Sequence, residues 1–248
     1  MTPMHILISI DDTDDIDSRG TGEIAELLAQ GLAGNGLASC GRVTRHQLLL
    51  HPDIAYTSHN SSMCFPAQIA DESLDAVTSW CQKTLAAESV AAADPGLCVV
   101  AVERLSEPEA LIAYGRDAKE RVFSKGDAYQ KAADLGVHLS EHGGTGIGVI
   151  GALAGAGLRL SGSDGRFKGK FTLPGNDGIA QVGDIRQHGV DAVQTLAGDA
   201  LGVDELVRVG DECKLVLLKG EAVLLVAPAS AGDIAPWAVV ERRALRAF

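Results

Sequence analysis

Five aspartates occupy positions 11, 12, 14, 15 and 17, directly after the apolar run from His5 to Ile10. Carboxylates held this close repel one another and raise one another's pKa unless a cation or hydrogen-bond donors compensate. Asp11, Asp12 and Asp14 come first after the expected strand, and carboxylates with water are the oxygen ligands that Mg²⁺ uses when it holds phosphates. The pattern predicts a metal-binding and catalytic site at these three aspartates. The alternative is a solvated turn before a helix, because Asp and Thr are ordinary turn and N-cap residues.

A glycine-rich segment, "HGGTGIGVIG", covers residues 142–151 and is followed by the small-residue run "ALAGAG". Glycines let backbone N–H groups approach an anion, and the positive end of a following buried helix would face the same anion. We therefore expect a triphosphate against this backbone, close in space to the aspartates. The candidate nucleotide-binding residues are Gly144, Thr145, Gly146, Gly148 and Gly151. The alternative is a close-packed helix of small residues.

Two common nucleotide motifs do not account for this segment. Gly146, Gly148 and Gly151 match GxGxxG, but that fingerprint follows a buried strand, and "VHLSEH" is a poor one. The P-loop pattern GxxxxGK[ST] is absent from the sequence. The glycines therefore favour a phosphate contact without specifying a Rossmann domain.

Two weaker candidates are a polar loop and a basic cluster. The loop includes Thr57 and His59, and a plain loop role for His59 is an open alternative. The cluster consists of Arg159, Arg166, Lys168 and Lys170, of which Arg166 and Lys168 are candidate nucleotide-binding residues. A solvated hairpin edge is the alternative for the cluster. Either candidate supplies groups suited to phosphate oxygens.

The composition excludes several classes of protein. The chain has 248 residues, 46% of them hydrophobic, which is enough for a packed core. Its net charge of −12 disfavours broad binding to nucleic-acid backbones. No run approaches the roughly 20 apolar residues of a membrane span, and no signal peptide is evident, so we expect a cytoplasmic location. The five cysteines form no CxxC pair and are expected to be reduced thiols.

Strand and helix patterns alternate in the first two thirds of the chain. Strands are expected at 43–50, at 63–69 and in "LCVVAV", with an amphipathic helix through Leu74 to Leu85. Ser106 and Ser124 each resemble the start of a capping box. From Arg159 onward, glycine-rich turns separate "KFTL", "CKLVLL", "AVLLVA" and "WAVVERR", and Lys219-Gly220 suits a hairpin turn.

These patterns predict an α/β fold, with α+β as the other possibility. We expect a mixed sheet flanked by helices and a smaller strand-rich C-terminal part. The expected domains are residues 1–160, which bind nucleotide and metal, and residues 161–248, which are richer in strand.

The two main motifs resemble a known family. "IDDTDD…GTG" is similar to the "IDDTDS…G" opening of the archaeal agmatidine synthetases, which modify a cytidine of an isoleucine tRNA. "GTGIGVIGALAGAG" resembles that family's "GLIGALAAIG", and "HPDIAYTSHNSS" resembles its "NPNIPYKTRGN" loop, with Thr57 and His59 in place of Lys and Arg. The family's cysteine zinc ribbon has no counterpart here, so the chain resembles a short form.

The resemblance implies an ATP-binding, kinase-like domain whose acidic loop holds Mg²⁺. It carries Asp11, Asp12 and Asp14 over as metal or phosphate-site residues, Gly20 as a loop glycine, and Gly148 and Gly151 as members of the glycine-rich segment. Because the chain is acidic and has neither the zinc ribbon nor the two loop cations, we do not expect it to bind a large RNA without another protein.

Three hypotheses about function follow. The leading one is a Mg²⁺-dependent, ATP-using phosphotransferase-like or ligase-like enzyme, related to tRNA modification, that acts on a small molecule or a nucleic-acid end. The second is a nucleotide-binding or sensing module that has lost the chemistry. The third is a phosphohydrolase, which ranks last because Ile16 stands where the DxDxT signature requires Thr.

Overall fold

The computed structural model describes residues 3–15, 18–54, 60–210 and 212–248. The chain divides into two compact units, Met1–Ser161 (unit 1) and Gly162–Phe248 (unit 2). The division lies beside residue 160, near the point where glycine-rich turns and short strand-like segments begin in the sequence. Among the described helices, none combines the length and apolar character needed to cross a membrane.

Unit 1 is built on a sheet in the strand order β6-β5-β1-β4-β3, with β2 also paired to β4. Every described pair in it is antiparallel. The carboxyl end of the central strand β1 therefore lies beside the amino ends of β4 and β5, its neighbours in the sheet. The strands are β1 (Pro3–Asp11), β2 (Ser39–Cys40), β3 (Thr44–Gln47), β4 (Ser61–Ala70), β5 (Gly96–Ala101) and β6 (His138–Glu141).

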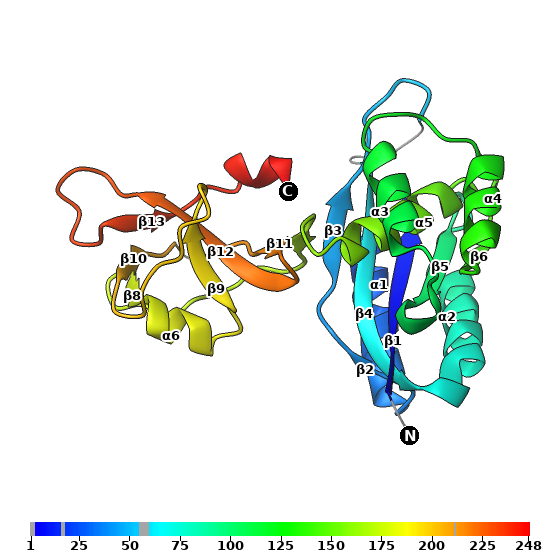
Figure 1. Ribbon diagram of the computed structural model, residues 1–248, viewed down its shortest axis with the longest axis horizontal. Helices are drawn as coiled ribbons and strands as arrows, with labels where there is room; N and C mark the ends of the chain where they lie inside the picture. Colours follow the sequence, from blue (N-terminus) through cyan, green and yellow to red (C-terminus); the bar gives the residue numbers. More distant parts are fainter. Residues whose placement is uncertain (1–2, 16–17, 55–59, 211) are drawn as a thin grey trace. The chain divides into compact units, whose positions relative to one another are not determined.

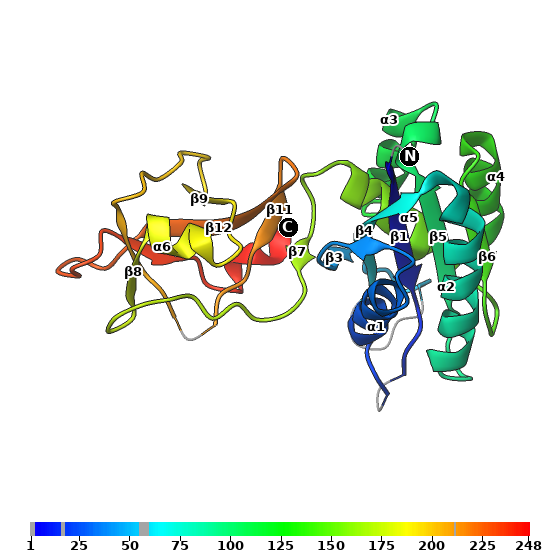
Figure 2. The same cartoon turned by 90° about the horizontal axis from the view of Figure 1, so that it is seen from below.

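Helices cover both faces of this sheet, as the blue to green part of Figure 1 and the turned view in Figure 2 show. α1 (Thr21–Gly34) and α2 (Leu74–Glu88) lie on one face. α3 (Pro108–Asp117), α4 (Lys125–Leu135) and α5 (Val149–Leu160) lie on the other. Single-turn 3-10 helices occur at Asp71–Ser73 and Val102–Arg104. The expected α/β class is confirmed.

The alternation of side chains along β1 decides which layer each residue meets. Ile6, Ile8 and Ile10 pack with residues of α1 and α2. Leu7 packs in the opposite core with residues of α3, α4 and α5. Asp11 has the same parity as Leu7, so the strand carries its carboxylate toward the α5 layer.

Most helix ends in unit 1 that carry a capping signal in the sequence are formed by the capping residues expected there. Asn35 caps α1 and Gly36 has a φ of 67°, as the Asn-Gly pair predicts. Ser124 forms the expected capping box with Asp127. The capping box expected at Ser106 is wrong, because Pro108 takes the first helical position and leaves Glu107 as an N-cap without a side-chain hydrogen bond.

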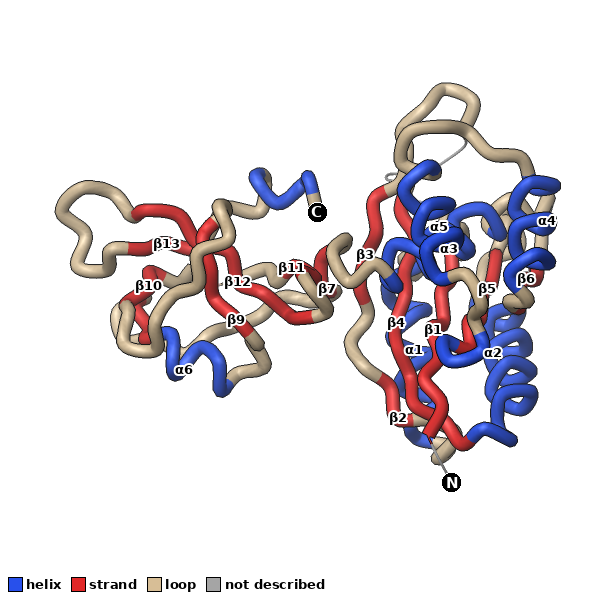
Figure 3. Tube along the Cα trace, in the orientation of Figure 1, coloured by secondary structure: helices blue, strands red, loops and turns tan. Residues whose placement is uncertain are grey.

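Unit 2 consists mainly of short strands, coloured red in Figure 3. The order is β7-β11-β12-β13-β10-β8, with β9 beside β12. The β12–β9 and β10–β13 pairs are parallel and the others antiparallel. The elements are β7 (Arg166–Phe167), β8 (Ile179–Gln181), α6 (Val182–Gln187), β9 (Ala192–Thr195), β10 (Leu206–Arg208), β11 (Val216–Leu218), β12 (Glu221–Pro228), β13 (Trp237–Val239) and a 3-10 turn at Ala244–Ala247.

The C-terminal expectations are met in part. Lys219 and Gly220, with φ values of 51° and 82°, join β11 to β12 as the expected hairpin turn. "KFTL" is not a strand, because only Phe171 forms a bridge there, to Cys213. The sequence does not predict β9 and α6, because the segments that form them show no clear periodicity of apolar residues.

Gly96 permits a close approach between the backbones of β5 and the glycine-rich segment. A side chain at Gly96 would come within 2.2 Å of the Gly148 carbonyl carbon and 2.3 Å of the Val149 nitrogen, both backbone atoms. We expect Gly96→Ala to lower the free energy of unfolding by about 2 kcal/mol or more, measured by chemical denaturation. Gly34→Ala is the control, because its side chain would meet nothing within 4 Å. Equal stability of the two variants would contradict this close packing.

Candidate functional site

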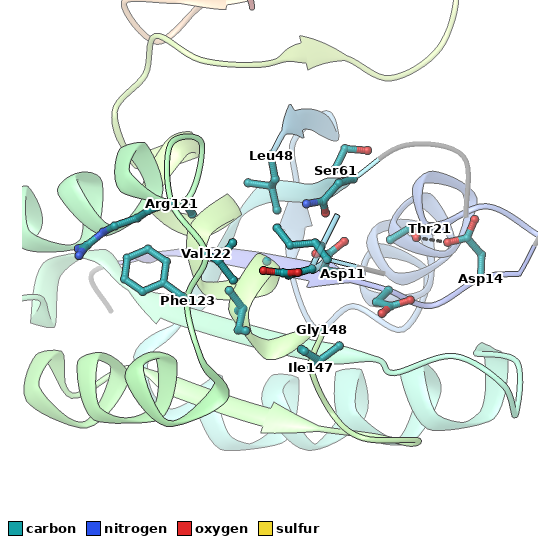
Figure 4. A pocket seen from close by; sticks show the side chains of 17 residues that line it. Asp11, Asp14, Thr21, Leu48, Ser61, Arg121, Val122, Phe123, Ile147 and Gly148 are labelled. Atoms are coloured by element: carbon teal, nitrogen blue, oxygen red, sulfur yellow. Dashed lines mark hydrogen bonds between the residues drawn. The ribbon is translucent and has the colours of Figure 1, made fainter. Parts of the chain in front are cut away.

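One pocket of unit 1 is lined by both predicted motifs (Figure 4). The acidic loop contributes the end of β1 and the residues after it, and the glycine-rich segment contributes the start of α5. These segments are more than a hundred residues apart in sequence. The motif residues lining the pocket are Asp11, Asp12, Asp14, Ile147, Gly148, Ile150 and Gly151.

Asp11 is the buried member of the acidic loop, with 9% of its surface exposed. Its carboxylate lies against Gly151, where an added Cβ would come within 1.6 Å of Oδ2. Burial raises the pKa of Asp11 to about 8, and the negative charge of Asp12 adds to this effect. Only a glycine in the first turn of α5 leaves room for this carboxylate.

Asp12 turns the chain out of the strand in a left-handed conformation, with a φ of 53°. Asp tolerates this region better than most residues with a side chain. The pKa of Asp12 is raised to about 6 by burial first and then by the charges of Asp94 and Asp14, while a hydrogen bond from the Asp94 backbone acts in the opposite direction. Two neighbouring carboxyl groups thus have pKa values well above the usual range.

Asp14 is fixed to the start of α1. Its Oδ1 accepts a hydrogen bond of 2.6 Å from the hydroxyl of Thr21, the first residue of that helix. Gly20 takes the N-cap position with extended backbone. A side chain at Gly20 would meet Asp14 Oδ2 at 3.8 Å, an ordinary contact, so the expected glycine role there has no steric basis.

Asp94 occupies the amides that were expected to contact an anion. Its Oδ1 accepts hydrogen bonds from the N–H groups of Thr145 and Gly146, and its carbonyl accepts one from Gly148 at 3.0 Å. A phosphate at Gly144 to Gly146 would have to replace this carboxylate. The pocket itself is lined by Gly148 and Gly151 instead. One feature of the sequence could have drawn attention to Asp94: it belongs to the Asp-Pro-Gly turn before "LCVVAV".

The carboxylates do not form a complete metal site by themselves. Among the described residues, no three His, Cys, Asp or Glu side chains are grouped closely enough to hold a metal ion. Mg²⁺, however, commonly uses only one or two carboxylates together with water and substrate phosphates. The buried, mutually repelling carboxyl groups of Asp11 and Asp12 fit an ion that is completed by a nucleotide.

Arg121, which the sequence did not single out, is the sole basic residue among the described residues that line the pocket. It donates to Asp117 at 2.6 Å and lies over the ring of Phe123, 4.5 Å from its centroid. The lining also contains Asp53, so carboxylates outnumber cations. Thr57 and His59 lie outside the described residues, although Ile54 and Asn60 on either side of their loop line the pocket.

The expected basic cluster is divided between the two units. Arg159 lies near the end of α5 in unit 1 and donates to Thr44 Oγ1 at 3.0 Å. Arg166, Lys168 and Lys170 belong to unit 2, and Lys170 pairs with Glu212. With Arg242 they lie near Lys214, whose pKa is lowered by burial first and then by these four positive charges.

Comparison with known proteins finds similarity in fold. No protein-family profile and no curated protein sequence matches the chain. Apo TiaS, a tRNA agmatidine synthetase, superposes with a TM-score of 0.54 at 20% identity, over 62% of this chain and 35% of that one. The complex of TiaS with its isoleucine tRNA and ATP superposes with a TM-score of 0.54 at 20% identity, over 70% of this chain and 40% of the TiaS chain. The complex of TiaS with the same tRNA, AMPCPP and agmatine superposes with a TM-score of 0.53 at 19% identity, over 72% of this chain and 42% of the TiaS chain.

The chain therefore spans less than half the length of the TiaS structures that it matches. The likeness supports a TiaS-like fold, in agreement with the resemblance of the two motifs. At this level of identity it extends to the fold alone.

The buried charge of Asp11 predicts a pH-dependent cost to stability. Because the folded pKa is raised to about 8 from the usual 3.8, the unfolded chain ionises first as the pH rises. The cost is therefore absent below about pH 4 and grows between pH 4 and 8. In metal-free protein at pH 7, Asp11→Asn should raise the melting temperature by about 2–4 °C or more.

Thermal melts of both proteins from pH 4 to pH 8 test this expectation, and the gain should shrink toward pH 4. Asp71→Asn serves as the control, because Asp71 is exposed and pairs with Arg104 at the surface. An Asp11→Asn variant less stable than the wild type at pH 7 would show that the carboxylate is compensated in the fold.

Proposed function

We propose that unit 1 binds ATP together with Mg²⁺ and that the chain is a phosphotransferase-like enzyme. The observation that carries the proposal is the pocket in which Asp11, Asp12 and Asp14 meet the start of α5. The pKa values of Asp11 and Asp12 are raised because burial, and then the neighbouring aspartates, oppose ionisation of these two carboxyl groups. A divalent cation carried by a nucleotide would compensate their charge.

The roles of the residues follow from their positions. Phosphoryl transfer depends on positioning and charge neutralisation more than on covalent chemistry by the protein. Asp11 and Asp12, with Asp14 beside them, would hold Mg²⁺, which would neutralise the phosphates. Gly148 lets α5 approach the backbone of Asp94 and Asp11, and Gly151 leaves room for the carboxylate of Asp11. Thr21 orients Asp14 through its hydroxyl.

The TiaS-like fold adds to this proposal, because TiaS complexes contain ATP or AMPCPP together with tRNA. By that relation the chain would use ATP in a reaction akin to tRNA modification, as a transferase or ligase. We propose a small molecule or a nucleic-acid end as the acceptor. The basic groups around Lys214 in unit 2, Arg166 and Lys168 among them, are by themselves suited to binding phosphate oxygens.

A second candidate is a nucleotide-binding or sensing module without chemistry. It is favoured by the single basic residue, Arg121, among the described lining residues, and that residue is already paired with Asp117. Thr57 and His59 also stand where the resembling family has Lys and Arg. Release of ADP, AMP or pyrophosphate from ATP by the purified chain alone would identify the enzyme. Tight Mg²⁺-dependent ATP binding without turnover would identify the module.

Asp12→Asn tests the metal assignment with little disturbance of the backbone, because Asn also tolerates the left-handed conformation at this position. We expect Mg²⁺ to strengthen ATP binding to the wild type by at least about tenfold and to the variant much less, since the variant loses a carboxylate ligand. Calorimetric titration with and without Mg²⁺ measures this. Glu72→Gln, an exposed carboxylate after β4 at the opposite end of that strand from Ser61, should behave as the wild type. Retention of the full Mg²⁺ effect in Asp12→Asn would remove Asp12 from the site.

The charge distribution also predicts the behaviour toward RNA. Unit 1 carries 21 acidic and 11 basic residues and unit 2 carries 12 and 10, so neither unit is basic as a whole. We expect only weak binding of intact tRNA by the chain alone, because phosphate contacts by Lys and Arg dominate such affinity. Filter binding at several salt concentrations measures it. Nanomolar binding at physiological salt, weakening steeply as salt is added, would contradict the expectation.

A further inference from the structure

Two large apolar side chains are exposed at the proposed nucleotide pocket. Val122 is 45% exposed and Ile147 is 46% exposed, and both line the pocket. Val122 lies in the segment between α3 and α4, and Ile147 lies in the glycine-rich segment before α5. Exposed apolar surface beside a polar pocket is a common mark of a ligand site.

The pocket is polar on one side and apolar on the other. Figure 4 shows Arg121, Val122 and Phe123 to one side of Asp11, and Thr21 and Asp14 to the other. The lining also includes the apolar side chains of Leu48, Ile54 and Ile150. A ligand that spans this pocket therefore needs an apolar part and a part that tolerates carboxylates.

The apolar side is packed against the core of unit 1. The ring of Phe123 stacks on Tyr114, with centroids 4.4 Å apart and planes 27° from parallel. The guanidinium of Arg121 lies over the Phe123 ring and is fixed by its ion pair with Asp117. Tyr114 is 3% exposed, so the stack is anchored in the core of unit 1. In sequence, Val122 lies between Arg121 and Phe123.

We infer that Val122, with Ile147, holds the nucleobase of the bound nucleotide, and that the phosphates with their metal point toward Asp12 and Asp14. This inference rests on the proposed function. It gives the apolar face of the base an apolar surface that is otherwise exposed to water. It also gives the carboxylates the cation that they lack.

The opposite orientation is disfavoured by charge. It would place the phosphates against Val122, where Arg121 is the nearby cation and already pairs with Asp117. It would also leave Asp11, Asp12 and Asp14 facing a base without a compensating charge. Val122 and Ile147 are therefore specificity-determining residues for a nucleotide as opposed to a bare polyphosphate.

Val122→Ser separates the two parts of the ligand. The probes are Mg²⁺–ATP, titrated by calorimetry, and Mg²⁺–tripolyphosphate, which has no base and is measured by competition with a fluorescent ATP analogue. We expect the variant to bind Mg²⁺–ATP about fivefold or more weakly, while its affinity for Mg²⁺–tripolyphosphate stays unchanged. Ile147→Ser should show the same pattern. Val203→Ser is the matched control, because Val203 is 54% exposed and belongs to unit 2.

Each contrary outcome has a distinct meaning. Equal weakening of both probes by Val122→Ser would place the phosphates at Val122 and overturn the inference. If both variants bind Mg²⁺–ATP as tightly as the wild type, the nucleobase does not contact Val122 and Ile147. If the wild type binds Mg²⁺–ATP but does not bind Mg²⁺–tripolyphosphate at millimolar concentration, the placement of the phosphates toward Asp12 and Asp14 is contradicted. Absence of Mg²⁺–ATP binding to the wild type would instead defeat the proposed function itself. Thermal melts confirm that each variant is folded.

Discussion

The carboxylate of Asp11, buried against the first turn of α5, is the constraint around which the site of unit 1 is organised. The start of a helix favours a negative charge through its exposed N–H groups and dipole. Burial and the neighbouring aspartates outweigh that effect, because the pKa of Asp11 rises to about 8. The fold therefore keeps a carboxyl group where its charge is costly, and Gly151 is needed to admit it. A structure that served stability alone would place an apolar residue at this position.

The antiparallel sheet explains how distant segments reach this carboxyl group. In parallel α/β sheets, ligands bind at the carboxyl ends of several strands. In unit 1 the carboxyl end of β1 lies beside the amino ends of β4 and β5. Asn60, just before β4, and Asp94, two residues before β5, are thereby brought to the acidic loop. The site is formed from one strand end and two strand beginnings.

Asp94 shows how a glycine-rich segment can be satisfied by its own chain. The N–H groups of Thr145 and Gly146 bind its carboxylate, as they would bind a phosphate oxygen. This contact holds the segment against β5, and Gly96 allows the two backbones to approach. The anion-binding geometry inferred from the glycines exists, but it serves the fold. The pocket is lined by residues that follow these amides in the sequence, namely Ile147, Gly148, Ile150 and Gly151.

Local chemistry in the sequence determined the elements whose signals are short in range, and only the tertiary structure decided which residues share the pocket. The Asn35-Gly36 helix stop, the Ser124 capping box and the Lys219-Gly220 hairpin depend on neighbouring residues, so they could be predicted without a partner segment. The contacts of Asp94 with Thr145 and of Asp11 with Gly151 depend on strand order and helix packing, which join segments distant in the chain. Periodicity and spacing describe one segment at a time, whereas burial and charge compensation depend on what the fold places opposite. For that reason the acidic loop was evident from the sequence alone, and the apolar surface at Val122 was not.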